Sequence, residues 1–244
     1  ICVEGKLTRL GALDLSVTFD EFEDVAPDGV MTFRNVIAEL PGTGPDQILL
    51  MSHFDTKSGI AANFSGANDS GSSTGLLLEL AGLLAQGGVW DGPGLVFAFL
   101  DGEESLYAYG PRDGLHGSRR LARQMKERNA RLRAVLLLDM VGDADLSLTI
   151  PRNSTPDLKL MLLDAAEAQG CRDKVKLVNY AILDDHQPFL DLGYPAINII
   201  DFEYGRRPGA NDYWHTKHDT IDKLSAESLR QVGALTLEML MRLR

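Results

Sequence analysis

Five segments of the chain carry the hydrophobic pattern of β-strands. Residues 31–40 alternate apolar with polar positions and end at Pro41-Gly42, as a half-buried strand closed by a turn would. Four more segments are short apolar runs, the pattern of strands buried on both faces, at residues 47–52, 95–100, 134–140 and 195–200. The pattern therefore predicts a central, mostly parallel sheet.

Three further stretches repeat their apolar residues with the period of an α-helix. One helix is predicted after a run of capping Ser and Thr residues, with Leu76, Leu77, Leu80, Leu83 and Leu84 on its buried face. A second is predicted to begin at Thr155-Pro156 and to end at Gly170. The third is predicted to run from Ser225 to the C-terminus, with four residues facing inward, namely Leu229, Val232, Leu235 and Met239.

The alternation of strands and helices determines the expected fold class. No internal repeat or low-complexity linker interrupts the alternation. We therefore expect a single catalytic domain over residues 1–244, with a three-layer α/β/α architecture around a twisted, mostly parallel (mixed) sheet.

Composition excludes several classes of partner. The chain has 24 Lys and Arg against 35 Asp and Glu, a net charge of −11, and no local basic stripe, so neither nucleic acid nor a membrane surface is an expected partner. Its apolar runs are far shorter than the roughly 20 residues that span a bilayer. Cys2 and Cys171 are the only cysteines, which excludes a disulfide framework and a thiolate metal site. With no obvious apolar seam, we expect a monomer.

Polar residues follow the predicted strands at the edge where open α/β sheets bind ligands. His53, Glu104 and Asp139 follow three strands, Asp69 lies in the turn 66–71, and His215 lies in a loop after the last strand. Nitrogen and carboxylate oxygen without thiolate is the donor set typical of catalytic zinc. These five residues are therefore candidate metal ligands.

Each of these residues also has an ordinary structural interpretation. A single strand-end carboxylate is often a helix cap or a solvated charge, so the five candidates carry weight only together. Glu103 and Glu104 are more informative, because neighbours at a strand end point to opposite sides, and one could bind metal while the other acts as a general base. Asp184-Asp185 could cap a short helix, and Trp214 could be either core or the wall of a pocket.

These motifs resemble the zinc-dependent peptidase superfamily that contains bacterial di-zinc aminopeptidases and animal-type glutaminyl-peptide cyclotransferases. The shared motifs are His53-Phe54-Asp55, the turn from Gly66 to Ser70, the pair Glu103-Glu104 and the late His215. Three features resemble the animal-type (type II) cyclotransferases in particular: the extra residues between the Glu pair and Gly117-Ser118-Arg119, Asp184 before Asp185-His186, and Trp214 before His215. We interpret the chain as a bacterial homologue of this branch.

The resemblance implies a single zinc ion held by Asp69, Glu104 and His215, with Glu103 as proton shuttle. It implies that Asp139 and Asp184 hydrogen-bond with that glutamate and the reacting amide. The residues implied to bind substrate are Trp214, Tyr109 and Leu183. The expected reaction converts an N-terminal glutamine of peptides or proteins to pyroglutamate and releases ammonia.

The sequence departs from the animal pattern at three points, and two alternative functions stay open. Tyr109 stands where animal enzymes tend to have Trp, Ala210 replaces a pocket aromatic, and the cysteine pair near the first motif is missing. A di-zinc aminopeptidase would use Asp69 as a bridge, with His53 and Glu104 on one zinc and Asp139 and His215 on the other.

The remote alternative is an inactive peptide-binding domain. The resemblance favours a secreted or periplasmic location, but this chain contains no signal segment, which leaves the compartment open.

Overall fold

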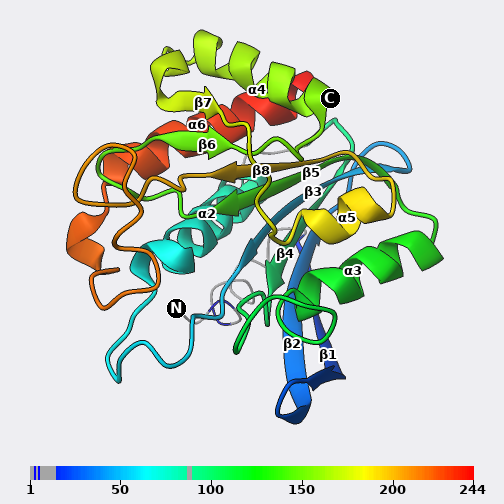
Figure 1. The fold of residues 1–244 in the computed structure, drawn as a ribbon. Coiled ribbons are helices and arrows are strands. Elements are labelled where there is room, and N and C mark those ends of the chain that lie inside the picture. The colour runs from blue at the N-terminus through cyan, green and yellow to red at the C-terminus, as the bar shows by residue number, and fades with distance from the viewer. Residues whose placement is uncertain (1–2, 4, 6–14, 87–89) are drawn as a thin grey trace.

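A mixed six-stranded sheet forms the centre of the molecule (Figure 1). The computed structural model describes Val3, Gly5 and residues 15–86 and 90–244. The strands run in the order β1-β2-β4-β3-β5-β8. Their bounds are β1 Ser16–Ala26, β2 Gly29–Leu40, β3 Asp46–His53, β4 Gly94–Leu100, β5 Arg131–Asp139 and β8 Ala196–Ile200. All five strands predicted from the sequence are therefore present.

The four strands on one side of the sheet are parallel. β3 pairs in parallel with β4 and β5, and β5 pairs in parallel with β8, so these four strands end at one edge of the sheet. β1 and β2 form an antiparallel hairpin, which projects from the rest of the sheet in Figure 1. β1 was not predicted, because an outer strand needs only a half-apolar pattern and its sequence is rich in acidic residues.

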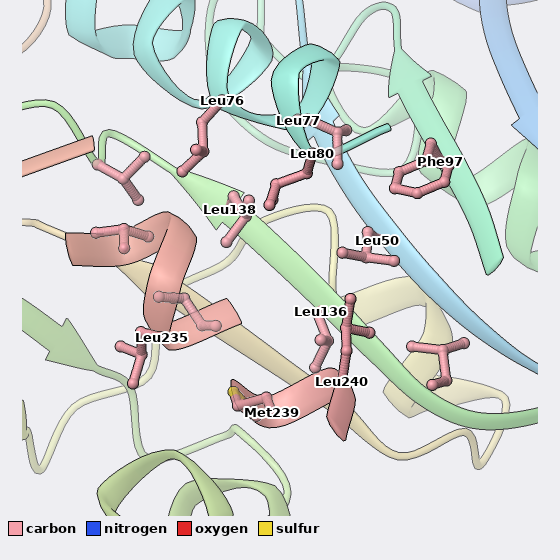
Figure 2. Close-up of a cluster of buried hydrophobic side chains, with 14 of the residues drawn as sticks. Leu50, Leu76, Leu77, Leu80, Phe97, Leu136, Leu138, Leu235, Met239 and Leu240 are labelled. Atoms are coloured by element: carbon pink, nitrogen blue, oxygen red, sulfur yellow. The ribbon is translucent and has the colours of Figure 1, made fainter. Parts of the chain in front are cut away.

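Helices cover both faces of the sheet. α2 (Ser73–Gln86), α4 (Pro156–Ala168) and α6 (Ala226–Arg242) lie on one face, and α3 (His116–Glu127) and α5 (Gln187–Asp191) lie on the other. Alternate strand residues supply the two cores, since successive side chains point to opposite faces. Figure 2 shows Leu50, Leu136 and Leu138 of the sheet facing the leucines of α2 and α6.

The three predicted helices are α2, α4 and α6, with differences in detail. Ser225 caps α6 as expected, accepting hydrogen bonds from the backbone N–H groups of Glu227 and Ser228. Thr155 occupies the N-cap position of α4, but its hydroxyl accepts the N–H of Ala196 instead. The prediction that Leu83 is buried is wrong, because its side chain is 52% exposed. α2 packs against β3, β4, β5 and α6, so Leu78 is buried as well as the predicted stripe.

Several small elements connect the layers. Strands β6 (Leu148–Ile150) and β7 (Val175–Leu177) form a separate parallel pair, and short helical turns occur at η1 (Ala67–Ser72), η2 (Arg172–Lys174) and η3 (Ile221–Lys223). Cys171 is a buried free thiol, and Cys2 lies outside the described residues. Among the described helices, none has both the length and the apolar character that crossing a membrane requires. The fold is single-domain α/β, as expected, and the extension of the domain over all of residues 1–244 stays a prediction.

Candidate active site and metal centre

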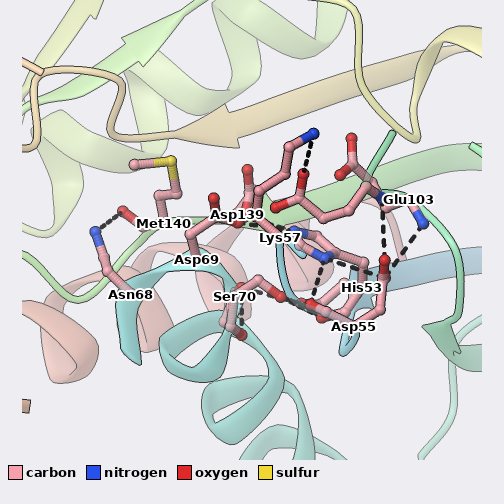
Figure 3. Close-up of polar contacts among 12 residues, drawn as sticks. His53, Asp55, Lys57, Asn68, Asp69, Ser70, Glu103, Asp139 and Met140 are labelled. Carbon is pink, nitrogen blue, oxygen red and sulfur yellow. Dashed lines mark hydrogen bonds and ion pairs between the residues drawn. The ribbon is translucent and has the colours of Figure 1, made fainter. Parts of the chain in front are cut away.

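A cavity of about 270 Å³ lies at the edge of the sheet where the parallel strands end. Its lining contains nearly all the candidate residues, namely Asp69, Glu103, Glu104, Tyr109, Asp139, Leu183, Asp184, Trp214 and His215. His53, the last residue of β3, is buried beside Asp69 and Asp139 (Figure 3). The structure therefore brings together residues that are up to 162 positions apart in the sequence, from His53 to His215.

A larger cavity, of about 710 Å³, lies at the opposite ends of the same strands. Its lining is formed largely by turns, together with Glu39, Arg128 and Arg131. Glu39 lies 3.7 Å from Arg128 in an exposed ion pair. Size alone would favour this cavity, but the converging histidines and carboxylates identify the smaller one as the candidate site.

Asp69, Glu104 and His215 form one group that could hold a metal ion, here called the outer group. His215 Nε2 lies 3.0 Å from Glu104 Oε1 and 3.2 Å from Asp69 Oδ2. A single ring nitrogen thus faces two carboxylate oxygens, whereas one N–H can make only one strong hydrogen bond. His215 has a left-handed backbone, with φ of 52°, a conformation that non-glycine residues adopt mostly at special sites.

His53, Asp69 and Asp139 form a second such group, here called the inner group. His53 Nε2 lies 3.2 Å from Asp69 Oδ1 and 3.4 Å from Asp139 Oδ1. Asp69 therefore belongs to both groups and offers one oxygen to each. The outer group has the three residues expected for a single zinc, and the position of Asp69 agrees with the bridge expected in a di-zinc aminopeptidase, but the pairing expected for that alternative was wrong. His53 lies with Asp139 and His215 with Glu104, because these are the side chains that reach the same oxygens of Asp69.

Two atoms in these groups support metal binding. Among the described residues, Glu104 Oε2 and Asp139 Oδ1 are buried and accept no hydrogen bond. Their nearest cationic groups are Lys57 Nζ, at 3.6 Å from Glu104 Oε2, and His53 Nε2, at 3.4 Å from Asp139 Oδ1, so each oxygen keeps capacity to bind a cation. Burial opposes ionisation of Asp69, but hydrogen bonds from His215 and His53 prevail and lower its pKa. An ionised carboxylate shared between two imidazoles is a donor set that fits a divalent cation.

Asp55 holds the Glu103-Glu104 pair in place. The two oxygens of Asp55 accept the backbone N–H groups of Glu103, at 3.2 Å, and of Glu104, at 3.0 Å. Asp55 Oδ1 also lies 3.4 Å from His53 Nδ1. β4 ends at Leu100, and Gly102, with φ of 71°, turns the chain before the pair. The two glutamates therefore lie in a loop. The prediction that they lie at the end of a strand is wrong, because β4 ends at Leu100.

Asp219 holds the segment that carries Asp69. Its carboxylate accepts the backbone N–H groups of Asn68, at 2.7 Å, and of Asp69, at 3.2 Å, and also the hydroxyl of Tyr204, at 3.0 Å. Asn68 in turn donates through its side chain to the carbonyl of Met140. The sequence analysis noted Asp55 only as part of the shared motif at residues 53–55 and did not single out Asp219, so the positioning role of both residues was missed. The one signal in the sequence that could have pointed to Asp219 is its position four residues after the candidate ligand His215.

Glu103, Asp139 and Asp184 form a cluster of buried acids. Burial, followed by the charges of neighbouring acids, raises the pKa of Asp184 well above its ordinary value, and burial raises that of Asp139 to about 6. Burial likewise raises the pKa of Glu103 well above normal, against the opposing charge of His53. The neighbouring acids contribute to the raised pKa of Asp184, in the direction expected from crowding, but burial is the larger cause.

Asp184 does not act as a helix cap. The N-cap of α5 is His186, and in the described residues no side chain caps that helix. The carboxylate of Asp184 instead accepts a hydrogen bond of 2.7 Å from the amide of Asn198 on β8. Together with its place in the cavity lining, this favours a role in the site over the helix-cap interpretation.

Aromatic and apolar side chains form the other walls of the cavity. Trp214 stacks on His215 at 4.0 Å between ring centroids and meets Phe202 edge to face at 5.0 Å. Tyr109 donates a hydrogen bond of 2.8 Å from its hydroxyl to Glu103 Oε1. Leu183 lines the same cavity with its side chain 47% exposed, which places it toward the mouth. The cavity thus combines a polar floor with an apolar rim.

Fold and site together define a class of protein. A mixed α/β/α sheet that gathers His, Asp and Glu ligands at the carboxyl ends of its parallel strands is the architecture of the zinc-exopeptidase-like proteins. The sequence matches the model of peptidase family M28 over residues 35–240, and the chain belongs to this family.

Individual relatives narrow the comparison. The chain is 29% identical to the glutaminyl-peptide cyclotransferase of Drosophila melanogaster, covering 89% of this chain and 68% of the relative. Its fold is similar to a glutaminyl cyclase from an Acidobacteriales bacterium, with 37% identity, a TM-score of 0.90, and coverage of 99% and 83%. It is also similar to a Zn-dependent exopeptidase from Parabacteroides distasonis, at 26% identity, TM-score 0.85, and coverage of 98% and 88%. The predicted relationship to glutaminyl cyclases, including bacterial ones, is confirmed.

Proposed function

We propose that this protein is a glutaminyl-peptide cyclotransferase, which converts the N-terminal glutamine of a peptide or protein to pyroglutamate and releases ammonia. The observation that carries the proposal is the position of Glu103, which shares one small cavity with the outer group on one side and with Asp139 and Asp184 on the other. A volume of about 270 Å³ suits a single side chain rather than a long peptide. The similarity to glutaminyl cyclases supports the same function.

The proposed cofactor is one zinc ion, held by Asp69, Glu104 and His215 of the outer group. These residues supply nitrogen and carboxylate oxygen, the usual donors of catalytic zinc, and they border the cavity. When bound, zinc supplies Lewis-acid stabilisation of the charge that develops on the glutamine amide oxygen. The family relationship and the similarity to a zinc exopeptidase support this choice of metal.

In the proposed reaction, the α-amine of the substrate attacks its own side-chain amide carbon. A C–N bond forms within the ring, the bond to the amide nitrogen breaks, and ammonia leaves without consumption of water. Glu103 accepts the proton from the attacking amine and returns it to the leaving nitrogen. Its pKa, raised by burial well above the ordinary value, favours uptake of the proton from the amine.

The remaining residues bind and orient the substrate. Asp139 and Asp184 place acceptors beside Glu103, where the protons of the substrate amine and amide need partners. Trp214 and Tyr109 provide flat walls for the glutamine side chain. Leu183, toward the mouth, would meet the second residue of the substrate. Asn198, which donates to Asp184, fixes the direction of that carboxylate.

One observation favours a second candidate, a di-zinc aminopeptidase. The inner group is complete, and Asp69 is placed to bridge two ions. Two zinc ions held by the two groups would supply an activated water molecule for hydrolysis of an N-terminal residue. The number of zinc ions bound per chain therefore distinguishes the cyclotransferase, with one ion, from the aminopeptidase, with two.

The experiment that tests the proposal is an ammonia-release assay on a peptide that begins with glutamine, with mass spectrometry of the product. Alanine-para-nitroanilide serves as the control substrate, and the zinc content of the same preparation is measured. We expect ammonia, a pyroglutamyl product and about one zinc per chain, with an intact anilide. Anilide cleavage with about two zinc ions would identify an aminopeptidase, and binding of the peptide without either product would identify an inactive binding domain.

Other properties remain proposals of the same kind. We propose a monomer, because the sequence shows no obvious apolar seam, and we propose neither nucleic-acid nor membrane partners, because the net charge is −11 without a basic stripe. A secreted or periplasmic location is proposed by analogy with relatives of this family. Gel filtration of the purified protein tests the first proposal, and fractionation of the source cells tests the second.

A further inference from the structure

Tyr109 contacts the proposed proton shuttle directly. Its hydroxyl donates to Glu103 Oε1 over 2.8 Å, and both residues line the cavity. A hydrogen bond to a charged acceptor is stronger than one between neutral groups and also fixes direction. Packing against the substrate side chain would require only the aromatic ring of Tyr109. The hydrogen bond to Glu103 therefore indicates a second role, which depends on the hydroxyl.

The loop around Tyr109 is built to hold its ring in one position. The carboxylate of Asp113 accepts three successive backbone N–H groups, those of residues 106, 107 and 108, immediately before Tyr109. Arg119 donates to the carbonyl of Gly110, immediately after it.

Gly114 sits against the tyrosine ring. It has φ of +76°, and a Cβ added there would lie 2.6 Å from Tyr109 Cδ1. The close approach of the ring thus depends on glycine. Hydrogen bonds therefore hold the backbone on both sides of Tyr109, and Gly114 packs against its ring.

A backbone hydrogen bond also joins the residues that follow this loop to Glu103. Leu115, just after Gly114, donates its backbone N–H to the carbonyl of Glu103 over 2.9 Å. Lys57 donates to Ser105, two residues after Glu103, and lies 6.0 Å from the ring of Tyr109. Tyr109 and Glu103 are therefore held within one network of contacts that the protein itself supplies.

We propose that Tyr109 is a positioning residue for the reaction, whose hydroxyl holds Glu103 by Oε1 and leaves Oε2 directed at the substrate amine. This inference rests on the proposed function of Glu103 as proton shuttle. It assigns to Tyr109 more than the wall of the glutamine pocket. With one carboxylate oxygen fixed, the other keeps one direction through both proton transfers, and such alignment contributes to the rate rather than to substrate affinity.

The test is Tyr109→Phe, which keeps the ring and removes only the hydroxyl. Tyr107→Phe is the matched control, because it removes a hydrogen bond from a tyrosine hydroxyl to a carboxylate, that of Asp28. Tyr107 belongs to the same loop but is 72% exposed and does not line the cavity. Ammonia release is measured in steady state and in single turnover with enzyme in excess, so that slow product release cannot mask the effect. Zinc content and the melting temperature of each variant are measured alongside.

We expect Tyr109→Phe to lower kcat and the single-turnover rate by roughly 10- to 100-fold, the range for one lost hydrogen bond to a charged group. KM, zinc content and melting temperature should stay at their wild-type values, and Tyr107→Phe should match wild type throughout. A wild-type single-turnover rate in Tyr109→Phe, or a change in KM alone, would overturn the inference and leave Tyr109 as a wall. If the wild-type protein itself releases no ammonia, the proposed function fails instead.

Discussion

The outer and inner groups contain the same kinds of residue and share Asp69, yet they differ in their surroundings. The side chain of His215 in the outer group is 18% exposed and borders the cavity, whereas that of His53 in the inner group is 1% exposed. Burial opposes the charged form of His53, but the adjacent carboxylates of Asp139, Asp55 and Asp69 hold its pKa well above normal. A protonated imidazole can therefore balance the inner acids without an ion, and the presence of ligands does not determine how many metals bind.

The largest expected effect comes from Glu104→Gln, which removes a ligand of the outer group only. The protein should lose its zinc and, with it, charge stabilisation of several kcal/mol, a fall in kcat of about 10⁴-fold or more. Zinc analysis after dialysis, combined with the ammonia assay, checks both. Retention of one tightly bound zinc in this variant would show that the inner group, rather than the outer group, is the principal zinc site.

Glu103→Gln should separate proton transfer from metal binding, because Glu103 belongs to neither group. We expect kcat to fall by about 10²- to 10⁴-fold, the usual contribution of a general acid–base. Zinc content should equal that of wild type, in contrast with the adjacent Glu104→Gln. Activity close to wild type would remove Glu103 from the mechanism.

Asp219→Asn tests whether the outer group depends on support from behind Asp69. The amide keeps one acceptor but turns a donor toward the N–H groups of Asn68 and Asp69. We expect zinc affinity to fall by about 10- to 100-fold, as is typical for partners of metal ligands. Competition with a chelator measures the affinity, and Asp222→Asn, an exposed acid of the same segment, is the matched control. Equal affinities in the two variants would count against this support.

His53→Gln should distinguish the two groups most directly. If only the outer group binds zinc, the content stays near one per chain and activity falls by roughly 10-fold, since Asp69 and Asp139 lose a shared partner. If both groups bind, the content falls from two to one. Zinc analysis of wild type and variant in parallel reads out the difference.

The smallest expected effect is a pH dependence of the metal-free protein. Burial opposes protonation of His215, but hydrogen bonds to Asp69 and Glu104 raise its pKa to about 9. Its stabilising contribution is therefore complete below its ordinary pKa of 6.5 and is lost as the pH rises through about 9. We expect the free energy of unfolding to fall by about 1 kcal/mol over this interval, after allowance for solvent screening.

Urea unfolding between pH 6.5 and 9 measures this loss. The variant His215→Asn should show a flatter profile, whereas His218→Asn, an exposed histidine on the same loop, should follow wild type. Parallel profiles for all three proteins would contradict the assignment of this pH dependence to His215.

The sequence predicted the parallel strands and the ligand types, and the resemblance implied the set Asp69, Glu104 and His215, which lie together in the outer group. Runs such as residues 95–100 are recognisable because a strand buried on both faces must be apolar throughout. The grouping of His53 with Asp139 was not predicted, because it depends on β3 and β5 lying side by side in the sheet, which the order of strands along the chain does not reveal. The supporting contacts of Asp55, which was noted only as part of the motif 53–55, and of Asp219 were not predicted for a different reason. An acid that accepts backbone N–H groups has the same sequence signature as a solvated loop charge.

The contact between Asp219 and the segment of Asp69 also bears on how the protein folds. It joins residues 150 and 151 positions apart, and it forms only when the C-terminal loop meets a turn from the first third of the chain. Contacts of such high sequence separation are slow to form, because loop closure must precede them. The metal site should therefore be among the last parts of the molecule to assemble. Zinc uptake during refolding would then report completion of the whole chain topology, rather than of any local unit.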